Sequence, residues 1–258
     1  MPVWDPTRYL QFADARTRPF LDLIAQVPIE PATIVDLGCG PGHLTRFLRA
    51  RWPEAHILGI DSSAEMIDEA LRSNSDPDAN YDIYDVSTWR PYEPVDLIIS
   101  NAMFQWVPDQ FAVIGELLEH LTPGGAFAIQ VPNNACSATH TALDKLSRTD
   151  PYVDYLSDAR RLIPTEPGEY LEFFAERGFS VDAWETTYLH ILPGEDAVFE
   201  WMLGTGARPF LQALPEDLVE KFSAEFKALL REKFPAKPWG TPLPFRRTFA
   251  VAGPPPQV

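Results

Sequence analysis

The chain has 258 residues, of which 45% are hydrophobic, and its formal net charge at pH 7 is −16. The acidic balance disfavours a nucleic-acid partner, because phosphate binding needs a basic surface, and 16 Phe and 7 Trp residues exclude a disordered chain. Only Cys39 and Cys136 are present, and neither has a metal-ligand partner at the usual spacing, so we expect no disulfide framework and no metal site.

The opening residues MPVWDPTRYLQF lack the charged-then-apolar profile of a signal peptide. No apolar run approaches the roughly 18 residues of a membrane span. We therefore expect a soluble, cytoplasmic protein without membrane association or an obligate protein partner. The length fits one α/β domain with embellishments better than two independent domains.

Strand and helix patterns alternate through the first half of the chain. The VDLIIS run at 95–100 is almost wholly apolar, as expected for a strand covered by helices on both faces. The alternation predicts an α/β fold with a doubly wound, mostly parallel sheet. The predicted elements are helix 15–27, strand 33–37, a helix ending near 52, strand 56–60, a helix from 62 or 63 to 72, strand 80–84, strand 95–100, helix 110–121 and strand 126–131.

The second half predicts helices at 139–147 and 167–177 and strands at 180–192 and 243–253, which bring the sheet to seven strands. The helical pattern at 195–234 is too long for a simple connection, so we interpret it as a cap over the ligand-binding edge of the sheet. The predicted divisions are an N-terminal helical lid (1–30), an α/β core (31–192), a helical substrate cap (193–240), the final strand (241–252) and a flexible tail (253–258).

A glycine-rich turn joins the first predicted strand to a helix. Its sequence, Asp36-Leu-Gly38-Cys-Gly40-Pro-Gly42, lets a ligand approach the backbone and places N–H groups at a helix start. A dinucleotide-binding fold would have its third glycine at position 43, which is His43. The order D-x-G-x-G-x-G instead resembles motif I of the seven-strand class of S-adenosylmethionine-dependent methyltransferases. The alternative is that the glycines merely permit a tight turn.

Polar residues follow the next three predicted strands. Asp61, beside Ser62, can accept hydrogen bonds from both hydroxyls of a ribose, although it could also serve as an acid at a helix N-terminus. Asp85, beside Val86, is a candidate acceptor for an adenine amino group, with an ordinary loop acid as the alternative. Asn101 ends the fourth strand. Ligands of open α/β sheets bind beyond the carboxyl ends of the strands, where all these residues are expected to lie.

Further segments to be compared are YLQFADARTRP, DLGCGPG, GIDSSAEM, NAMFQWVPD, VPNN, WETTYLH, TGARPFLQ and FRRTFAVA. Together they resemble the trans-aconitate methyltransferases, which are class I, Rossmann-like carboxyl methyltransferases. The resemblance implies methyl transfer from S-adenosylmethionine to one carboxylate of trans-aconitate, giving a monomethyl ester and S-adenosylhomocysteine. It also implies that Gly38, Gly40 and Gly42 lie against the methionine part of the donor, that Asp61 holds the ribose and Asp85 the adenine, and that the Asn101 backbone holds the amino end.

This chemistry needs no catalytic residue. A sulfonium methyl is already activated and a carboxylate is already deprotonated at pH 7, so neither a general base nor a covalent intermediate is expected. In-line positioning in a dry site can lower the activation barrier by on the order of 7–11 kcal/mol. Gln105 and Trp106 follow the fourth strand and are expected near the methyl group. Trp106 could face the sulfonium or simply anchor the helix in the core.

A polycarboxylate substrate needs local cations on so acidic a protein. Arg208, at a helix start in the predicted cap, is the first candidate, and Tyr188 and His190 share a strand face with Trp184 and Thr186. Consecutive strand residues point to opposite faces, so at most one of Arg246 and Arg247 can reach the pocket, and Arg16 and Arg18 could close over it. The alternatives are solvated surface arginines, a sheet-edge tyrosine and a structural histidine.

Three other functions remain open at this stage. One is methylation of another small acid or of a carrier-linked malonyl ester. A second is a nicotinamide-dependent oxidoreductase, which the position of the third glycine disfavours. The third is a non-catalytic sensor of the nucleoside.

Overall fold

The computed structural model describes residues 13–159 and 161–255. The first 12 residues of the predicted lid and residues 256–258 of the predicted tail lie outside this part of the chain. The described residues form two compact units. We call them the core unit (13–132, 165–186 and 247–255) and the helical unit (133–159, 161–164 and 187–246).

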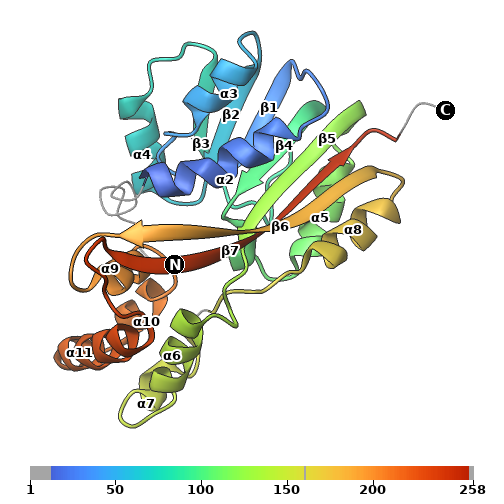
Figure 1. Cartoon of the computed structure of the whole chain (residues 1–258). Helices are drawn as coiled ribbons and strands as arrows, with labels where there is room; N and C mark the ends of the chain where they lie inside the picture. The colour runs from blue at the N-terminus through green and yellow to red at the C-terminus, as the bar shows by residue number, and fades with distance from the viewer. Residues whose placement is uncertain (1–12, 160, 256–258) are drawn as a thin grey trace. The chain divides into compact units, whose positions relative to one another are not determined.

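The described strands form one seven-stranded sheet with the order β3-β2-β1-β4-β5-β7-β6 (Figure 1). The pairings β1–β2, β1–β4, β2–β3 and β4–β5 are parallel, whereas β7 is antiparallel to β5. The predicted doubly wound, mostly parallel sheet is therefore confirmed. The strands are β1 (Thr33–Leu37), β2 (His56–Asp61), β3 (Ala79–Ile83), β4 (Val95–Asn101), β5 (Leu121–Pro132), β6 (Ser180–Leu192) and β7 (Thr241–Gly253).

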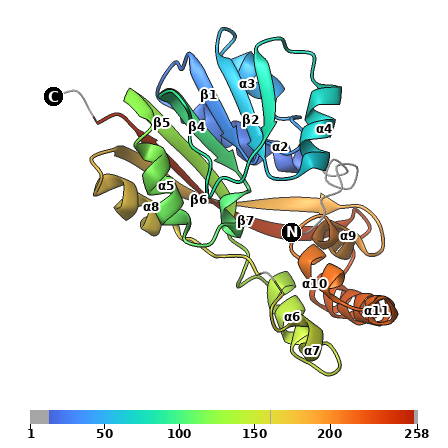
Figure 2. The ribbon, with the colours of Figure 1, turned by 180° about the vertical axis from the view of Figure 1, so that it is seen from behind.

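Helices cover both faces of the sheet in the core unit (Figures 1 and 2). α5 (Gln110–Leu118) and α8 (Pro167–Ala175) lie on one face, and α2 (Ala13–Ala25), α3 (Thr45–Arg51) and α4 (Ala64–Ser73) lie on the other. This double cover explains the continuous apolar run of β4, since side chains on both of its faces are buried.

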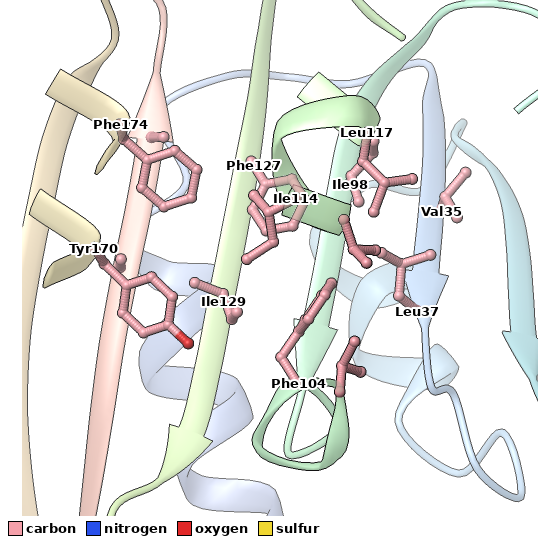
Figure 3. Packing of buried hydrophobic residues seen from close by; sticks show 14 of the residues in the cluster. Val35, Leu37, Ile98, Phe104, Ile114, Leu117, Phe127, Ile129, Tyr170 and Phe174 are labelled. Carbon is pink, nitrogen blue, oxygen red and sulfur yellow. The ribbon is translucent and has the colours of Figure 1, made fainter. Parts of the chain in front are cut away.

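The main hydrophobic core lies between the sheet and the α5/α8 layer (Figure 3). Ile98 of β4 is paired with Phe127 of β5, and the Phe127 ring centroid lies 5.7 Å from that of Phe174 in α8. Each fully buried aromatic or aliphatic side chain contributes about 1.5–3 kcal/mol by leaving water. The core thus fixes the strands whose carboxyl ends carry the candidate site.

The segment before β5 differs from the prediction. α5 ends at Leu118 and β5 begins at Leu121, so the TPGG sequence lies inside the strand. Gly124 has a φ of 92°, and the β4–β5 register shifts between Val95 and Leu97. The glycine therefore permits a β-bulge at this point of the strand. The sequence predicts a break between helix and strand here, because a β-bulge and a loop contain the same turn-forming residues. α2 also spans 13–25 where the pattern predicts 15–27.

The helical unit contains the predicted cap and residues on both sides of it. Its helices are α6 (Ala138–Ser147), α7 (Val153–Leu156), α9 (Ala197–Leu203), α10 (Arg208–Ala213) and α11 (Glu216–Lys233), and α7 was not predicted. α11 packs against α6 and α9, and the ring of its Phe222 is edge-on to that of Tyr152, just before α7, at 4.9 Å. Arg231 forms two hydrogen bonds to Asp196, which ties α11 to the start of α9.

Among the described residues, no helix combines the length and apolar character needed to cross a membrane. The core unit also contains a short 3-10 helix, η1 (Phe104–Trp106), directly after β4.

Candidate functional site

The three glycines of the turn after β1 all have left-handed backbone conformations, with φ angles of 73° for Gly38, 57° for Gly40 and 70° for Gly42. Side chains are disfavoured at such angles. A Cβ on Gly38 would lie 2.5 Å from Met103, and one on Gly42 would lie 2.9 Å from the Tyr81 hydroxyl. A Cβ on Gly40 would meet nothing within 4 Å. Only Gly40 therefore leaves its Cβ position open to a ligand.

The backbone N–H groups of this turn already have partners inside the protein. Gly38 and Cys39 both donate to the Ile60 carbonyl, at 2.8 and 3.0 Å, and Gly42 donates to the Cys39 carbonyl. Gly40 donates to Asp61 Oδ2 at 3.0 Å. The expectation that the turn offers N–H donors is therefore wrong at these four positions, because the end of β2 accepts three of the hydrogen bonds and the Cys39 carbonyl accepts the fourth. A diphosphate would find few donors here.

Asp61 is half-buried at the carboxyl end of β2, and the turn and the next helix orient it. Besides the bond from Gly40, its Oδ1 accepts a hydrogen bond from Ser63 N at 2.9 Å. Burial raises the pKa of Asp61, and the N–H groups of Ser63, Gly40 and Ser62 oppose that shift. A carboxylate has about four acceptor positions, so Asp61 retains capacity for further donors. Ser63 is the N-cap of α4, and Ser62 is exposed.

Three buried acceptor oxygens near the ends of β1 and β4 have no hydrogen-bond partner among the described residues: Asp36 Oδ2, Asn101 Oδ1 and Gln105 Oε1. Their residues are 2%, 7% and 3% exposed, respectively. Burial, and secondarily the charge of Asp61, raises the pKa of Asp36 to about 7. Unpaired buried acceptors are costly. Their presence together fits a ligand that brings hydrogen-bond donors or positive charge.

The turn after β4 is held by one side-chain hydrogen bond and one backbone hydrogen bond. Ala102 has a left-handed φ of 59°, and its carbonyl accepts a hydrogen bond from Gln105 Nε2 at 2.6 Å. Its N–H donates to the carbonyl of Gln130 in β5. Gln105 is buried in η1, whereas Trp106 is half-buried. Both residues thus follow the strand end as predicted.

Asp85 and Val86 follow β3. Asp85 is exposed, and its Oδ1 accepts from the Ser87 N–H at 2.9 Å and the Ser87 hydroxyl at 2.7 Å. Val86 is half-buried and packs against the main core. Asp85 is therefore available to solvent, although its loop already uses one of its oxygens.

The predicted substrate residues are divided between the two units. Tyr188, His190 and Arg208 belong to the helical unit. Tyr188 is buried with its ring stacked on that of His190, which in turn stacks on Trp201 at 4.7 Å. Arg208 is half-buried at the start of α10. The two rings thus contribute to an aromatic cluster of this unit.

The predicted arginines of the core unit have very different environments. Arg18 is exposed on α2, and Arg247 is buried in β7, where its Nη1 donates to Gln130 Oε1 at 2.9 Å. Arg246, in the helical unit, is held through its backbone by Asn134. The side chain of Arg16 is not among those that the structure describes.

Sequence reasoning missed two polar side chains. Gln130 interrupts the apolar run Ala126–Pro132, which is a signal that the pattern did contain. His140, in α6, has its Nδ1 3.1 Å from the hydroxyls of Ser137 and Thr139, and burial lowers its pKa to about 4, so the ring is neutral at pH 7. The described residues contain no group of three or more His, Cys, Asp or Glu side chains placed to hold a metal ion.

The sequence and the fold are similar to those of known methyltransferases. A family profile described as a methyltransferase domain matches residues 9–183. The trans-aconitate 2-methyltransferase of Streptomyces avermitilis is 45% identical, with 98% of this chain and 97% of that protein covered. The trans-aconitate 2-methyltransferase of an Azoarcus species is 41% identical, with 98% of this chain and 99% of that protein covered.

Solved structures share the fold at low sequence identity. The YcgJ protein from Bacillus matches with a TM-score of 0.60 at 12% identity, covering 94% of this chain and 100% of that one. A phosphoethanolamine N-methyltransferase of Haemonchus contortus, solved with S-adenosylhomocysteine, matches with a TM-score of 0.56 at 16% identity, covering 93% of this chain and 53% of that one. The chain belongs to the trans-aconitate 2-methyltransferase family, within the class I S-adenosylmethionine-dependent methyltransferases, and is an enzyme that uses S-adenosylmethionine as its methyl donor.

Proposed function

We propose that this enzyme esterifies one carboxylate of trans-aconitate, producing a monomethyl ester and S-adenosylhomocysteine. The relatives named for this activity match the chain over nearly its whole length. The observation that carries the donor half of the proposal is the group of unpartnered buried acceptors on Asp36, Asn101 and Gln105. They suit a ligand that carries an ammonium group and a sulfonium charge.

The donor site is proposed along the carboxyl ends of β1, β2, β3 and β4. Gly40 gives the ligand access to the backbone, while Gly38 and Gly42 shape the turn against Met103 and Tyr81. The remaining acceptor capacity of Asp61 suits the two hydroxyls of a ribose. The proposed adenine contacts are Asp85 and Val86, with Ser62 beside the ribose. The proposed contact of Asn101 is extended from its backbone to its unpartnered Oδ1.

The same geometry argues against a nicotinamide dinucleotide. The N–H groups of Gly38, Cys39 and Gly40 donate to β2, and α3 has only seven residues. A pyrophosphate would need those donors and a substantial helix N-terminus. A nucleoside without phosphate does not need them.

The donor, when bound, supplies an electrophilic methyl group. The task of the chain is to hold the acid in line with that methyl and to exclude water. Asp36 and Asn101 would orient the ammonium end, and Gln105 and Trp106 would border the methyl group. We propose no general base, because the carboxylate is already ionised at pH 7.

The acid side is proposed to use Arg247 and Arg18, which both lie in the core unit. The roles of Arg208, Tyr188 and His190 stay predictions from the sequence. With a net charge of −16, the protein needs local cations to hold a polycarboxylate. Residues 193–240 are proposed as the substrate cap. The cytoplasmic location and the absence of nucleic-acid and protein partners stay predictions from the sequence.

The test is mass spectrometry of the purified enzyme with methyl-labelled donor and one acid at a time: trans-aconitate, cis-aconitate, citrate, isocitrate and a malonyl thioester. We expect one labelled methyl on trans-aconitate, with equimolar S-adenosylhomocysteine. A clear preference for another acid would refute the proposed substrate. Donor binding without turnover of any acid would indicate that the protein is a non-catalytic sensor of the nucleoside. The control is Asp61→Ala, which should weaken donor binding and so show that methyl transfer depends on the donor site.

A further inference from the structure

Polar side chains form a row across one face of the sheet in the core unit. Asp36 of β1 is paired with Ile99 of β4, and Asn101 lies two residues beyond Ile99 on the same face. Asn101 is paired with Gln130 of β5. Arg247 of β7 is opposite Pro132, two residues beyond Gln130. These four side chains therefore share a face, and Ile98, Phe127 and Ile129 occupy the other face (Figure 3).

Gln130 and Arg247 are joined at the β7 end of this row. Gln130 is 0% exposed and Arg247 is 4% exposed, and Arg247 Nη1 donates to Gln130 Oε1 at 2.9 Å. A guanidinium group can only donate hydrogen bonds, so the amide oxygen must face Arg247. The amide orientation is thereby fixed, and Nε2 is the atom left for another partner.

The Nε2 group of Gln130 has no hydrogen-bond partner in the described residues, although it is buried. A buried amide donor without an acceptor is costly, and such groups commonly mark a site that a ligand completes. The unpartnered donor lies on the same side chain that binds a buried guanidinium. An acceptor placed there could therefore receive N–H groups from both residues, and a carboxylate has the planar shape and charge for that.

The polarity of the row changes from β1 to β7. Asp36 and Asn101 offer unpartnered acceptor oxygens, which suit the positively charged donor. Gln130 and Arg247 offer N–H groups, which suit an anion. We propose that Gln130 and Arg247 form a subsite for a non-reacting carboxylate of the acid substrate, with Gln130 as its positioning and specificity residue. This inference rests on the proposed function and adds to it the residues that select a polycarboxylate.

The decisive variant is Gln130→Glu. It places a carboxylate next to Arg247, and this carboxylate would compete with that of the substrate for the guanidinium. We expect the KM for trans-aconitate to rise roughly tenfold to a hundredfold, as for a lost charge-assisted hydrogen bond. We also expect kcat to change little, affinity for S-adenosylhomocysteine to be unchanged and the melting temperature to be equal or higher. A purely structural Gln130 would leave KM unchanged.

Matched variants separate charge from geometry. Asn80→Asp makes the same charge change at an exposed position of β3 and should leave KM unchanged. Arg247→Lys retains the charge but loses the planar fork, so its KM should also rise. Gln130→Met removes the amide without adding charge, and it gives the same test if the glutamate variant does not fold. If both Gln130 variants fold and keep the wild-type KM, the subsite is refuted.

A binding experiment separates this inference from the proposed activity. Calorimetry of the protein loaded with S-adenosylhomocysteine measures affinity for trans-aconitate without turnover. If the wild-type protein binds the acid more tightly than Gln130→Glu but methylates nothing, the proposed activity fails and the subsite stands. If the variant loses affinity for S-adenosylhomocysteine instead, the pair belongs to the donor and the inference is overturned. Absence of wild-type binding to any di- or tricarboxylate also overturns it.

Discussion

Donor affinity should depend on the protonation of Asp36. Burial and the nearby charge of Asp61 raise the pKa of Asp36 from 3.8 to about 7 in the ligand-free protein. An ammonium group bound beside Asp36 Oδ2 would favour the ionised form and lower that pKa. Binding would then release a proton from Asp36 at any pH below about 7.

The size of the effect follows from that pKa. At pH 6 only about a tenth of the ligand-free molecules carry an ionised Asp36, so affinity should be roughly tenfold weaker than at pH 8. Stability has the opposite dependence on pH. A raised carboxyl pKa favours the folded state at low pH, so the free energy of unfolding of the ligand-free protein should fall between pH 4 and pH 7. The pKa difference sets an upper limit of about 4 kcal/mol on this change.

The assay is calorimetry with S-adenosylhomocysteine at pH 6, 7 and 8, in two buffers whose ionisation enthalpies differ. We expect close to one proton released at pH 6 and almost none at pH 8. Asp36→Asn should remove the pH dependence, whereas Asp85→Asn, a change to an exposed acid after β3, should retain it. Wild-type affinity that is the same from pH 6 to pH 8 would refute the reasoning.

Gly42→Ala should lower the free energy of unfolding by about 1–3 kcal/mol in urea, because the added Cβ would meet a tyrosine hydroxyl at 2.9 Å. Gly40→Ala should cost less stability than Gly42→Ala but should weaken the binding of S-adenosylhomocysteine more. If calorimetry shows that Gly42→Ala weakens binding more, the assignment of an open Cβ position to Gly40 is contradicted. Tyr170→Phe should cost about 1–2 kcal/mol without changing kcat, since the buried Gln110 carbonyl loses a hydrogen bond of 2.7 Å; an unchanged urea midpoint would contradict this. Asp196→Asn should lower the urea midpoint more at pH 7 than at pH 3, because the cations of α11 hold the pKa of this carboxyl below its usual value and that stabilisation decreases as the pH falls below the usual value. An equal loss at both pH values would show that the ion pairs contribute nothing.

Local sequence patterns determine the strands well, because a strand buried between helices must be apolar along its length. Strand 33–37 and strand 180–192 were predicted with the observed bounds. The pattern could not separate a bulge from a loop at TPGG, since both use proline and glycine. It could not find α7 either, because four residues are too few to display a helical period.

The roles of the three glycines show what a sequence cannot reveal. Gly38 and Gly42 are constrained by Met103 and Tyr81, which are distant in the chain and approach only in the folded sheet. The motif treats all three glycines alike, yet only Gly40 has an open Cβ position. The same limit applies to the N–H groups of Gly38, Cys39 and Gly40, whose acceptors come from β2.

The row from Asp36 to Arg247 explains how so acidic a protein could bind both a cation and a polyanion. Acceptors over β1 and β4 favour the positively charged donor, and donors over β5 and β7 favour a carboxylate. The strand register sets the order of these groups, because paired residues of neighbouring strands share a face. The sequences of the loops could change without moving these polar side chains. The polarity that we propose selects the two reactants would therefore be built into the sheet itself.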